Sequence, residues 1–390
     1  MTTTSAKALE ALLFSGEYDR VVEATAHQTD PRMLPALVGA LALSGRLDEA
    51  ESAFRSMTPA TPDELIQARF FVIAGLCHAG QVGKALRRAR ESVSDRGVAG
   101  AASRFWIWQG LALVRFFEGR FARSRRFARR ALAAAVEASF PYARLLALDL
   151  LAHVLVETGE IHAGMRVLAQ AEQLAQALGY EANRVTLHTA RMVFQLRYLL
   201  LPLGAAVAQA REALADSSVS YFTRRNGLLE LAMALALGGD GRAARAELNE
   251  AHEIALPGSD RRGRTRISIA HATLAALSQG PEAAAQTLDE AWSTAGEQLT
   301  LAAEIAFVDV FFVGATARTR EGLAAVARAS GVARAQLAAA VLHGEALPVA
   351  SRIEDGLSRI LVACQRASTE ARLGQILDTQ LLGLTPWALG

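Results

Sequence analysis

A short turn motif recurs along the chain and constrains its fold more than any other feature. The motif consists of a glycine, any residue, an apolar residue, any two residues and a small residue. Copies begin at Gly16, Gly45, Gly80, Gly119, Gly159, Leu201, Gly239 and Gly280, and the last three are the weakest. The copies are spaced by roughly 40 residues, a period typical of helical repeats. We therefore expect one elongated stack of similar units.

The segment from Met33 to Pro62 illustrates one unit. Apolar residues at helical spacing precede a break at Ser44-Gly45, and a second amphipathic helix follows it. Small residues let two antiparallel helices approach closely, and glycine relieves the backbone where the first helix ends. Such a hairpin keeps apolar surface on both sides, so it needs neighbours like itself. No stretch alternates with the period of a strand, which predicts an all-α chain.

The positions around the breaks resemble the tetratricopeptide repeat family. The family places a large residue, a leucine and a small residue upstream of the break, and Trp108, Leu111 and Ala112 fill these positions before Gly119. The resemblance implies a right-handed α-solenoid of antiparallel helix hairpins over residues 1–300, followed by a C-terminal helical domain or cap over residues 301–390. Because the family's usual unit has about 34 residues, the longer units resemble the variant found in sensor regions of maltose-regulator-type bacterial transcription activators.

The resemblance also implies a binding groove. In the family, the first helix of each unit lines the inner surface with residues ten, six and three positions before the break. Transferred to this chain, these positions give the predicted partner-binding residues Phe70, Gln109, Phe116, Asp149, His153, Arg191, Gln195 and Tyr198. Mixed polar and aromatic side chains suit an extended peptide or a helix of a partner protein. The lysines and asparagines of the family's clamp for C-terminal carboxylates are missing, so this resemblance does not support carboxylate capture.

Two arginine clusters are candidate contact surfaces. The first lies along one predicted helix and forms a basic patch of Arg120, Arg123, Arg126 and Arg130. It is either a solvated outer face or a surface for an acidic protein segment or phosphates. The second opens a later predicted helix, where positive charge is unfavourable, and consists of Arg261, Arg262, Arg264 and Arg266. We interpret this unfavourable placement as a sign that the second cluster makes contacts.

Residues 321–362 resemble a phage-repressor-type helix-turn-helix. The features that carry the likeness are Ala327, Gly331, Val332, Leu337, Leu342, Gly344, Pro348 and a further apolar helix at 353–360. The resemblance implies that Arg334 and Gln336 begin the recognition helix, where side chains contact base edges in the major groove. The alternative interpretation is a hairpin that caps the solenoid.

The residues that carry chemistry form no catalytic or metal-binding motif. The glycines at Gly239 and Gly241 imitate a dinucleotide-binding fingerprint, but no strand precedes them. His252-Glu253 lacks the second histidine of a zinc protease. We therefore expect no enzymatic activity, no cofactor and no metal.

The composition favours a cytoplasmic protein. Cys77 and Cys364 lie far apart on apolar helical faces, which does not indicate a disulfide framework. The first residues do not resemble a signal peptide. The most apolar window, Leu301 to Ala317, is too short and too charged to span a membrane.

These observations lead to two functional hypotheses. The first is a non-enzymatic scaffold or adaptor in a bacterial regulatory pathway, which binds a segment of a partner protein in the solenoid groove. The second is a transcription regulator with a solenoid sensor and a C-terminal helix-turn-helix that binds DNA. The formal net charge of +2 favours a protein or peptide partner over nucleic acid. The oligomeric state is left open by the sequence.

Overall fold

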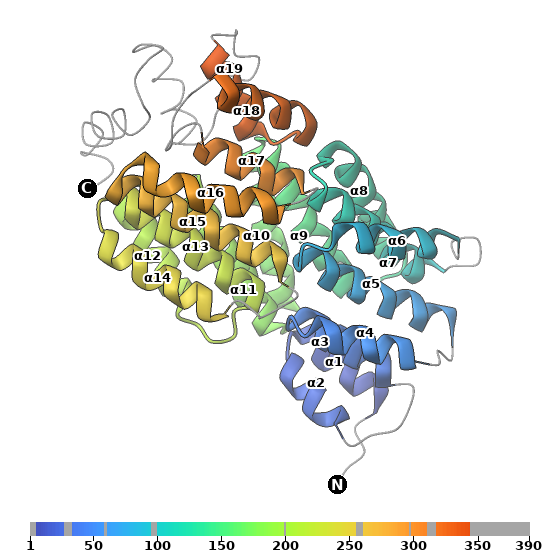
Figure 1. Ribbon diagram of the computed structural model, residues 1–390. Helices are drawn as coiled ribbons and strands as arrows, with labels where there is room; N and C mark the ends of the chain where they lie inside the picture. Colours follow the sequence, from blue (N-terminus) through green and yellow to red (C-terminus); the bar gives the residue numbers. More distant parts are fainter. Residues whose placement is uncertain are drawn as a thin grey trace.

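The computed structural model describes residues 5–26, 33–57, 61–94, 100–198, 200–254, 260–295, 298–309 and 317–343. Within these ranges the chain is all α (Figure 1). Antiparallel helix hairpins stack side by side into a right-handed α-solenoid of the tetratricopeptide type, as predicted. The helices are α1 (Ala6–Ser15), α2 (Tyr18–Thr25), α3 (Leu34–Leu43), α4 (Leu47–Ser56), α5 (Pro62–His78), α6 (Val82–Ser94), α7 (Ala101–Phe117), α8 (Phe121–Glu137), α9 (Pro141–Glu157), α10 (Ile161–Ala177), α11 (Glu181–Arg197), α12 (Leu203–Leu214), α13 (Tyr221–Leu237), α14 (Gly241–Ile254), α15 (Arg261–Gln279), α16 (Pro281–Ala295), α17 (Leu299–Val308), α18 (Ala317–Ser330) and α19 (Ala333–His343).

Left-handed glycines end the first helix of most hairpins, as the turn motif predicts. Gly119 has a φ of 74°, a region that favours glycine because it has no Cβ. Its N–H donates to the carbonyl of Phe116, and the N–H of Arg120 donates to the carbonyl of Arg115 at 2.8 Å. These bonds satisfy carbonyls that the end of α7 leaves unpaired. The same conformation occurs at Gly16, Gly45, Gly80, Gly159, Gly179 and Gly239.

One predicted break was right for the helix that follows it, because α12 begins two residues after Leu201 as α8 does after Gly119, but it was two residues late for the helix that precedes it. The motif placed it at Leu201, but α11 already ends at Arg197. The N–H of Leu200 donates to the carbonyl of Gln195 at 2.9 Å, and this bond corresponds to the second one at the Gly119 turn. The break therefore precedes Leu201, and no glycine marks it in the sequence.

The helices form two layers. Each of α3, α5, α7, α9, α11, α13 and α15 contacts the next along the inner layer, with α9 and α11 joined through side chains, and their hairpin partners form the outer layer. Inner helices such as α5 are buried on several sides, whereas α6 buries a narrow stripe that includes Ala85 and Ala89. These small residues let α6 approach α5 closely, and the opposite face of α6 is polar.

The solenoid winds so tightly that its second superhelical turn rests on the first. A Cβ added at Gly80 would lie 3.0 Å from the backbone nitrogen of Arg262, the second residue of α15. The N–H groups of Arg261 and Arg262 also donate to the carbonyl of Ala79 at 3.0 and 3.4 Å. The start of α15 thus pairs with the turn that follows α5, and each satisfies backbone groups of the other.

The same contact recurs at a constant interval along the chain. The turn at Gly16, after α1, lies against Ala182 at the start of α11. The turn after α7 lies against Leu299 at the start of α17, and the turn after α9 lies against Ala333 at the start of α19. We call these contacts the return seam. Each turn on it meets the helix that is ten helices further along.

The last described helices continue this packing. Phe121 of α8 and Val154 of α9 share a buried cluster with Leu323, Ala327 and Leu337 of α18 and α19. The predicted domain boundary at residue 300 stays a prediction, as does a separate role for residues 301–390. Gly344, Pro348, the helix expected at 353–360 and Cys364 lie outside the described residues.

Cys77 is fully buried and has no disulfide partner among the described residues, and burial raises the pKa of its thiol. No helix in the described part of the chain is long and apolar enough to cross a membrane.

Candidate functional site

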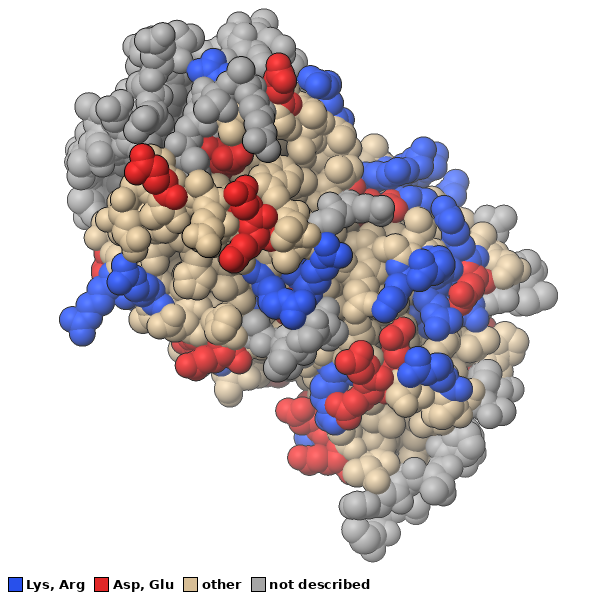
Figure 2. All heavy atoms as spheres, in the orientation of Figure 1, with Lys and Arg blue, Asp and Glu red and all other residues tan. Residues whose placement is uncertain are grey.

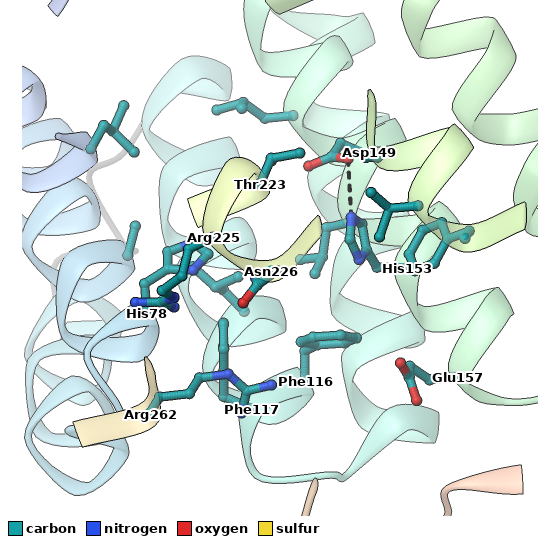
Figure 3. Close-up of a pocket in the computed structure, with 18 of the residues that line it drawn as sticks. His78, Phe116, Phe117, Asp149, His153, Glu157, Thr223, Arg225, Asn226 and Arg262 are labelled. Carbon is teal, nitrogen blue, oxygen red and sulfur yellow. Dashed lines mark ion pairs between the residues drawn. The ribbon is translucent and has the colours of Figure 1, made fainter. Parts of the chain in front are cut away.

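The inner helices enclose a central cavity of about 230 Å³ (Figure 3). This volume exceeds the roughly 150 Å³ of an engineered cavity that holds benzene. Aromatic and aliphatic side chains form much of the wall, including Phe70, Phe116, Phe117, Tyr142 and Phe194. Charged and polar side chains converge on the same space from α5, α7, α9, α11, α13 and α15. An apolar cavity with a few convergent polar groups is the usual form of a binding site.

Five predicted groove residues line this cavity. They are Phe70, Gln109, Phe116, Asp149 and His153. They come from three successive inner helices, α5, α7 and α9, whose breaks the sequence located correctly. Their predicted role in binding a partner stays a prediction.

The other three predicted groove residues, all on or beside α11, do not line the cavity, and their role in binding a partner stays a prediction. Arg191 instead binds Glu172 of α10, with 3.0 Å between Nε and Oε2. Tyr198 is buried beside the Phe194 ring, and Gln195 lies outside the wall. The reason is the misplaced break at Leu201, which shifts every position counted back from it.

Helix α9 contributes an acidic and an imidazole group to one side of the cavity. His153 Nε2 lies 3.5 Å from Asp149 Oδ1, and both side chains are about one third exposed. The His153 ring packs edge-on against Phe194, with 4.8 Å between the centroids. Figure 3 shows this pair at the edge of the cavity away from Arg262. The pair is therefore held in place yet accessible from the cavity.

The opposite side of the cavity is basic. Arg262 lies over the ring of Phe117, 4.9 Å from its centroid, and its Nη1 donates to Thr300 Oγ1 at 3.2 Å. Burial lowers the pKa of Arg262 to about 10, so the side chain is charged at neutral pH. His78 stacks on Phe222, and burial together with Arg262 lowers the pKa of its imidazole to about 3.

An ionic network of buried and half-buried side chains lies beside the cavity, and four of its five members line the wall. Arg197 of α11 contacts Glu157 of α9 at 3.0 Å, Glu230 of α13 at 3.6 Å and Glu304 of α17 at 3.3 Å. Arg266 of α15 contacts Glu230 at 2.5 Å and Glu304 at 3.3 Å. These five side chains connect five successive inner helices. Buried charges are stable only when such partners are present.

Sequence reasoning missed the cavity residues of α13 and α15. Arg225, Asn226 and Glu230 lie in the first ten residues of α13, and Arg262 and Arg266 lie near the start of α15. The positions ten, six and three residues before the breaks at 239 and 280 do not include these residues. In this part of the superhelix, the beginnings of the inner helices face the cavity, and the rule selects residues nearer their ends. The sequence did contain one indication of these residues, namely the arginine cluster at the start of a predicted helix, where positive charge is unfavourable. Members of this cluster do make contacts. Arg261 likewise donates to the carbonyl of Ser293 at 3.3 Å.

The predicted basic patch lies on the outer layer, away from the cavity. Arg120, Arg123, Arg126 and Arg130 are exposed on or beside α8. Figure 2 shows Lys and Arg side chains gathered over α6 and α8. Arg130 lies 5.1 Å from the centroid of the Trp108 ring, and Trp108 stacks on Phe127. A role of this patch in binding stays a prediction.

The helix-turn-helix prediction corresponds to α18 and α19. Gly331 is left-handed between the two helices, with a φ of 66°. Gln336 is exposed, and its amide donates to the carbonyl of Ala327 at 3.4 Å. The start of α19 lies on the return seam, against Gly159. DNA contact by Arg334 and Gln336 stays a prediction.

Comparison with known proteins shows the fold of the chain. No family model matches the sequence, and neither does any curated protein. A Rap protein complexed with Competence and Sporulation Factor has a TM-score of 0.55 and 12% identity, over 90% of this chain and 99% of that chain. NprR in complex with its cognate peptide NprX has a TM-score of 0.56 and 9% identity, over 90% of this chain and 98% of that chain. These similarities confirm the predicted helical solenoid.

Proposed function

We propose that the protein is a non-enzymatic, cytoplasmic adaptor of a bacterial regulatory pathway that binds a peptide or a peptide segment of a partner protein in its central cavity. The observation that carries this proposal is the convergence of seven inner helices, α3 to α15, on one cavity with an aromatic wall and charged groups at its sides. Extended peptides are bound in this way, by apolar pockets for side chains and polar groups for the backbone.

The two similar structures support a peptide as the ligand. NprR was solved with its cognate peptide NprX, and the Rap protein with Competence and Sporulation Factor. Only the fold is shared at this level of identity, so the ligand class is part of our proposal. The supporting feature of this chain itself is the set of polar side chains that face the cavity.

Affinity selection from a random decapeptide library tests the proposal. The full-length protein is expected to retain a set of related peptides, which mass spectrometry identifies. Leu113→Trp fills the cavity from α7 and is expected to weaken binding of these peptides roughly tenfold or more. Arg123→Gln changes an exposed residue of α8 and serves as the control. If no peptide is retained, or if Leu113→Trp retains all of them, the cavity is not a peptide site.

A DNA-binding role for α18 and α19 is the second candidate. It is favoured by the left-handed Gly331 between the helices and by the exposed Gln336. A gel shift with salt titration tests it, since phosphate contacts make affinity fall steeply with salt. Salt-sensitive binding that Arg334→Ala abolishes would support a transcription regulator, whereas no shift at low salt would exclude this role.

A further inference from the structure

The charges of the cavity define the ligand more narrowly, and this inference rests on the proposed function. Four arginines line the cavity, namely Arg197, Arg225, Arg262 and Arg266. Arg197 and Arg266 bind the glutamates of the ionic network, and Arg225 binds Asp260. Arg262 has no ion pair with a carboxylate among the described residues. Its guanidinium group therefore keeps N–H donors for a ligand.

The surroundings of Arg262 suit an anion. The side chain is held by the Phe117 ring and by Thr300, so little rotamer freedom is lost when a ligand binds. Arg225 lies beside His78 in Figure 3, and its Nε has no hydrogen-bond partner among the described residues. His78 is neutral at pH 7 and adds one more N–H donor. Three donor side chains from α5, α13 and α15 thus meet at one end of the cavity.

Two oxygen atoms on the wall lack donors. Gln109 is 4% exposed, its Nε2 donates to the carbonyl of Leu146, and its Oε1 has no partner among the described residues. The Oδ1 of Asn226 is buried and equally without a partner there. Buried acceptors are normally hydrogen-bonded, so a ligand that supplies N–H groups fits this part of the wall. A peptide backbone carries one such donor for each residue other than proline.

We propose that the cavity binds a peptide that carries a carboxylate, and that Arg262 binds this carboxylate. An arginine pairs with a carboxylate through two parallel hydrogen bonds, which fixes the orientation of the ligand as well as its affinity. The carboxylate belongs either to the C-terminus or to an acidic side chain of the peptide. The chain lacks the lysines and asparagines with which the tetratricopeptide family binds C-terminal carboxylates. This absence does not oppose the assignment, because Arg262 lies in the second half of the solenoid and is not one of the family's clamp positions.

Three synthetic decapeptide libraries separate these sources. The first has free C-termini, the second has amidated C-termini, and the third has amidated C-termini and contains no Asp or Glu. Each is presented to the full-length protein and to Arg262→Gln. Arg264→Gln removes the same charge from an exposed position of the same helix and is the matched control. Retained peptides are identified by mass spectrometry, and their affinities are measured by calorimetry.

We expect the third library to bind at least about tenfold more weakly than the first, since charged hydrogen bonds are the strong ones. Arg262→Gln is expected to abolish this preference, and Arg264→Gln to preserve it. Binding of the second library assigns the carboxylate to a side chain, and its loss assigns it to the C-terminus. Equal binding of all three libraries, or an unchanged preference in Arg262→Gln, would refute the assignment while leaving the peptide site intact. If no library binds, the proposed function itself fails.

Discussion

At the scale of single residues, the turn glycines fall into two groups. All of them adopt a left-handed φ, which favours glycine in any protein. Those of the first superhelical turn also lie on the return seam, where an added Cβ would meet another part of the chain. At Gly119 it would lie 3.1 Å from the carbonyl oxygen of Ser330, whereas at Gly239 it would meet nothing within 4 Å.

Substitution by alanine separates the two effects. Gly239→Ala is expected to lower the free energy of unfolding by about 1–2 kcal/mol, the cost of a left-handed alanine. Gly119→Ala is expected to lower it by at least about 1 kcal/mol more, because overpacking adds to the backbone cost. Urea unfolding of both variants measures the difference. An equal decrease in the free energy of unfolding for both variants would mean that the return seam accommodates an added methyl group without loss of stability.

The imidazole of His78 is expected to make the fold sensitive to acid. Burial lowers its folded-state pKa to about 3, from 6.5 in an unfolded chain. Below pH 6.5 the unfolded chain therefore binds a proton that the folded chain does not, and stability falls as the pH falls.

His78→Gln removes this effect. Between pH 6.5 and 4.5, the wild type is expected to lose up to roughly 2 kcal/mol more than the variant, at about 1.4 kcal/mol per pH unit. Urea unfolding at several pH values measures how steeply the free energy of unfolding changes with pH in the wild type and in the variant. Identical slopes would show that the His78 imidazole has the same pKa in the folded and the unfolded protein.

At the scale of helices, the ionic network makes the inner layer interdependent. Arg197 contacts carboxylates on α9, α13 and α17, and it is 15% exposed. Its removal leaves Glu157 without a cation and leaves Glu230 and Glu304 to share Arg266 alone. Such a loss is costly, because the remaining charges are buried and repel one another.

Arg197→Met is expected to destabilise the protein by about 3–5 kcal/mol, the range for breaking a buried ion pair. Arg211→Met breaks an ion pair with Glu247 in which the arginine is 48% exposed. This control is expected to cost less than about 1 kcal/mol. Chemical unfolding at pH 7 compares them, and a similar loss in both variants would contradict a structural role of the network.

The sequence predicted those features that follow from its local repeat pattern. The turn glycines locate the hairpins, and counting back from Gly119 and Gly159 identifies cavity residues of α7 and α9. The remaining cavity residues depend on the superhelical pitch, which results from small angles added over many hairpins. No local pattern encodes that sum, so Arg225 and Arg262 could not be placed. The error at α11 has a simpler cause, since its break has no glycine.

At the scale of the whole molecule, the second superhelical turn supports the first. Phe121 and Val154, from the first half of the chain, are buried by α18 and α19. In an open solenoid, the last helices would affect only their neighbours. Here the removal of α18 and α19 is expected to destabilise helices that lie far away in the sequence.

A chain that ends at residue 316 tests this support, and a chain that ends at residue 343 keeps both helices and is the control. The shorter chain is expected to lose at least about 2 kcal/mol, roughly the contribution of one fully buried large side chain. Hydrogen exchange in α8 and α9 is expected to accelerate in the shorter chain only. Unchanged exchange there would instead indicate an independent C-terminal domain.

The return seam also limits how this protein can evolve. An open stack can gain or lose a unit anywhere, because each unit touches only the adjacent ones. Here the deletion of one hairpin, such as α11 with α12, would displace every later helix relative to the turns that receive it. Side chains would then enter spaces that only glycine leaves empty. The number of repeats is therefore a fixed property of this protein, and variation in length is expected at the two ends of the chain.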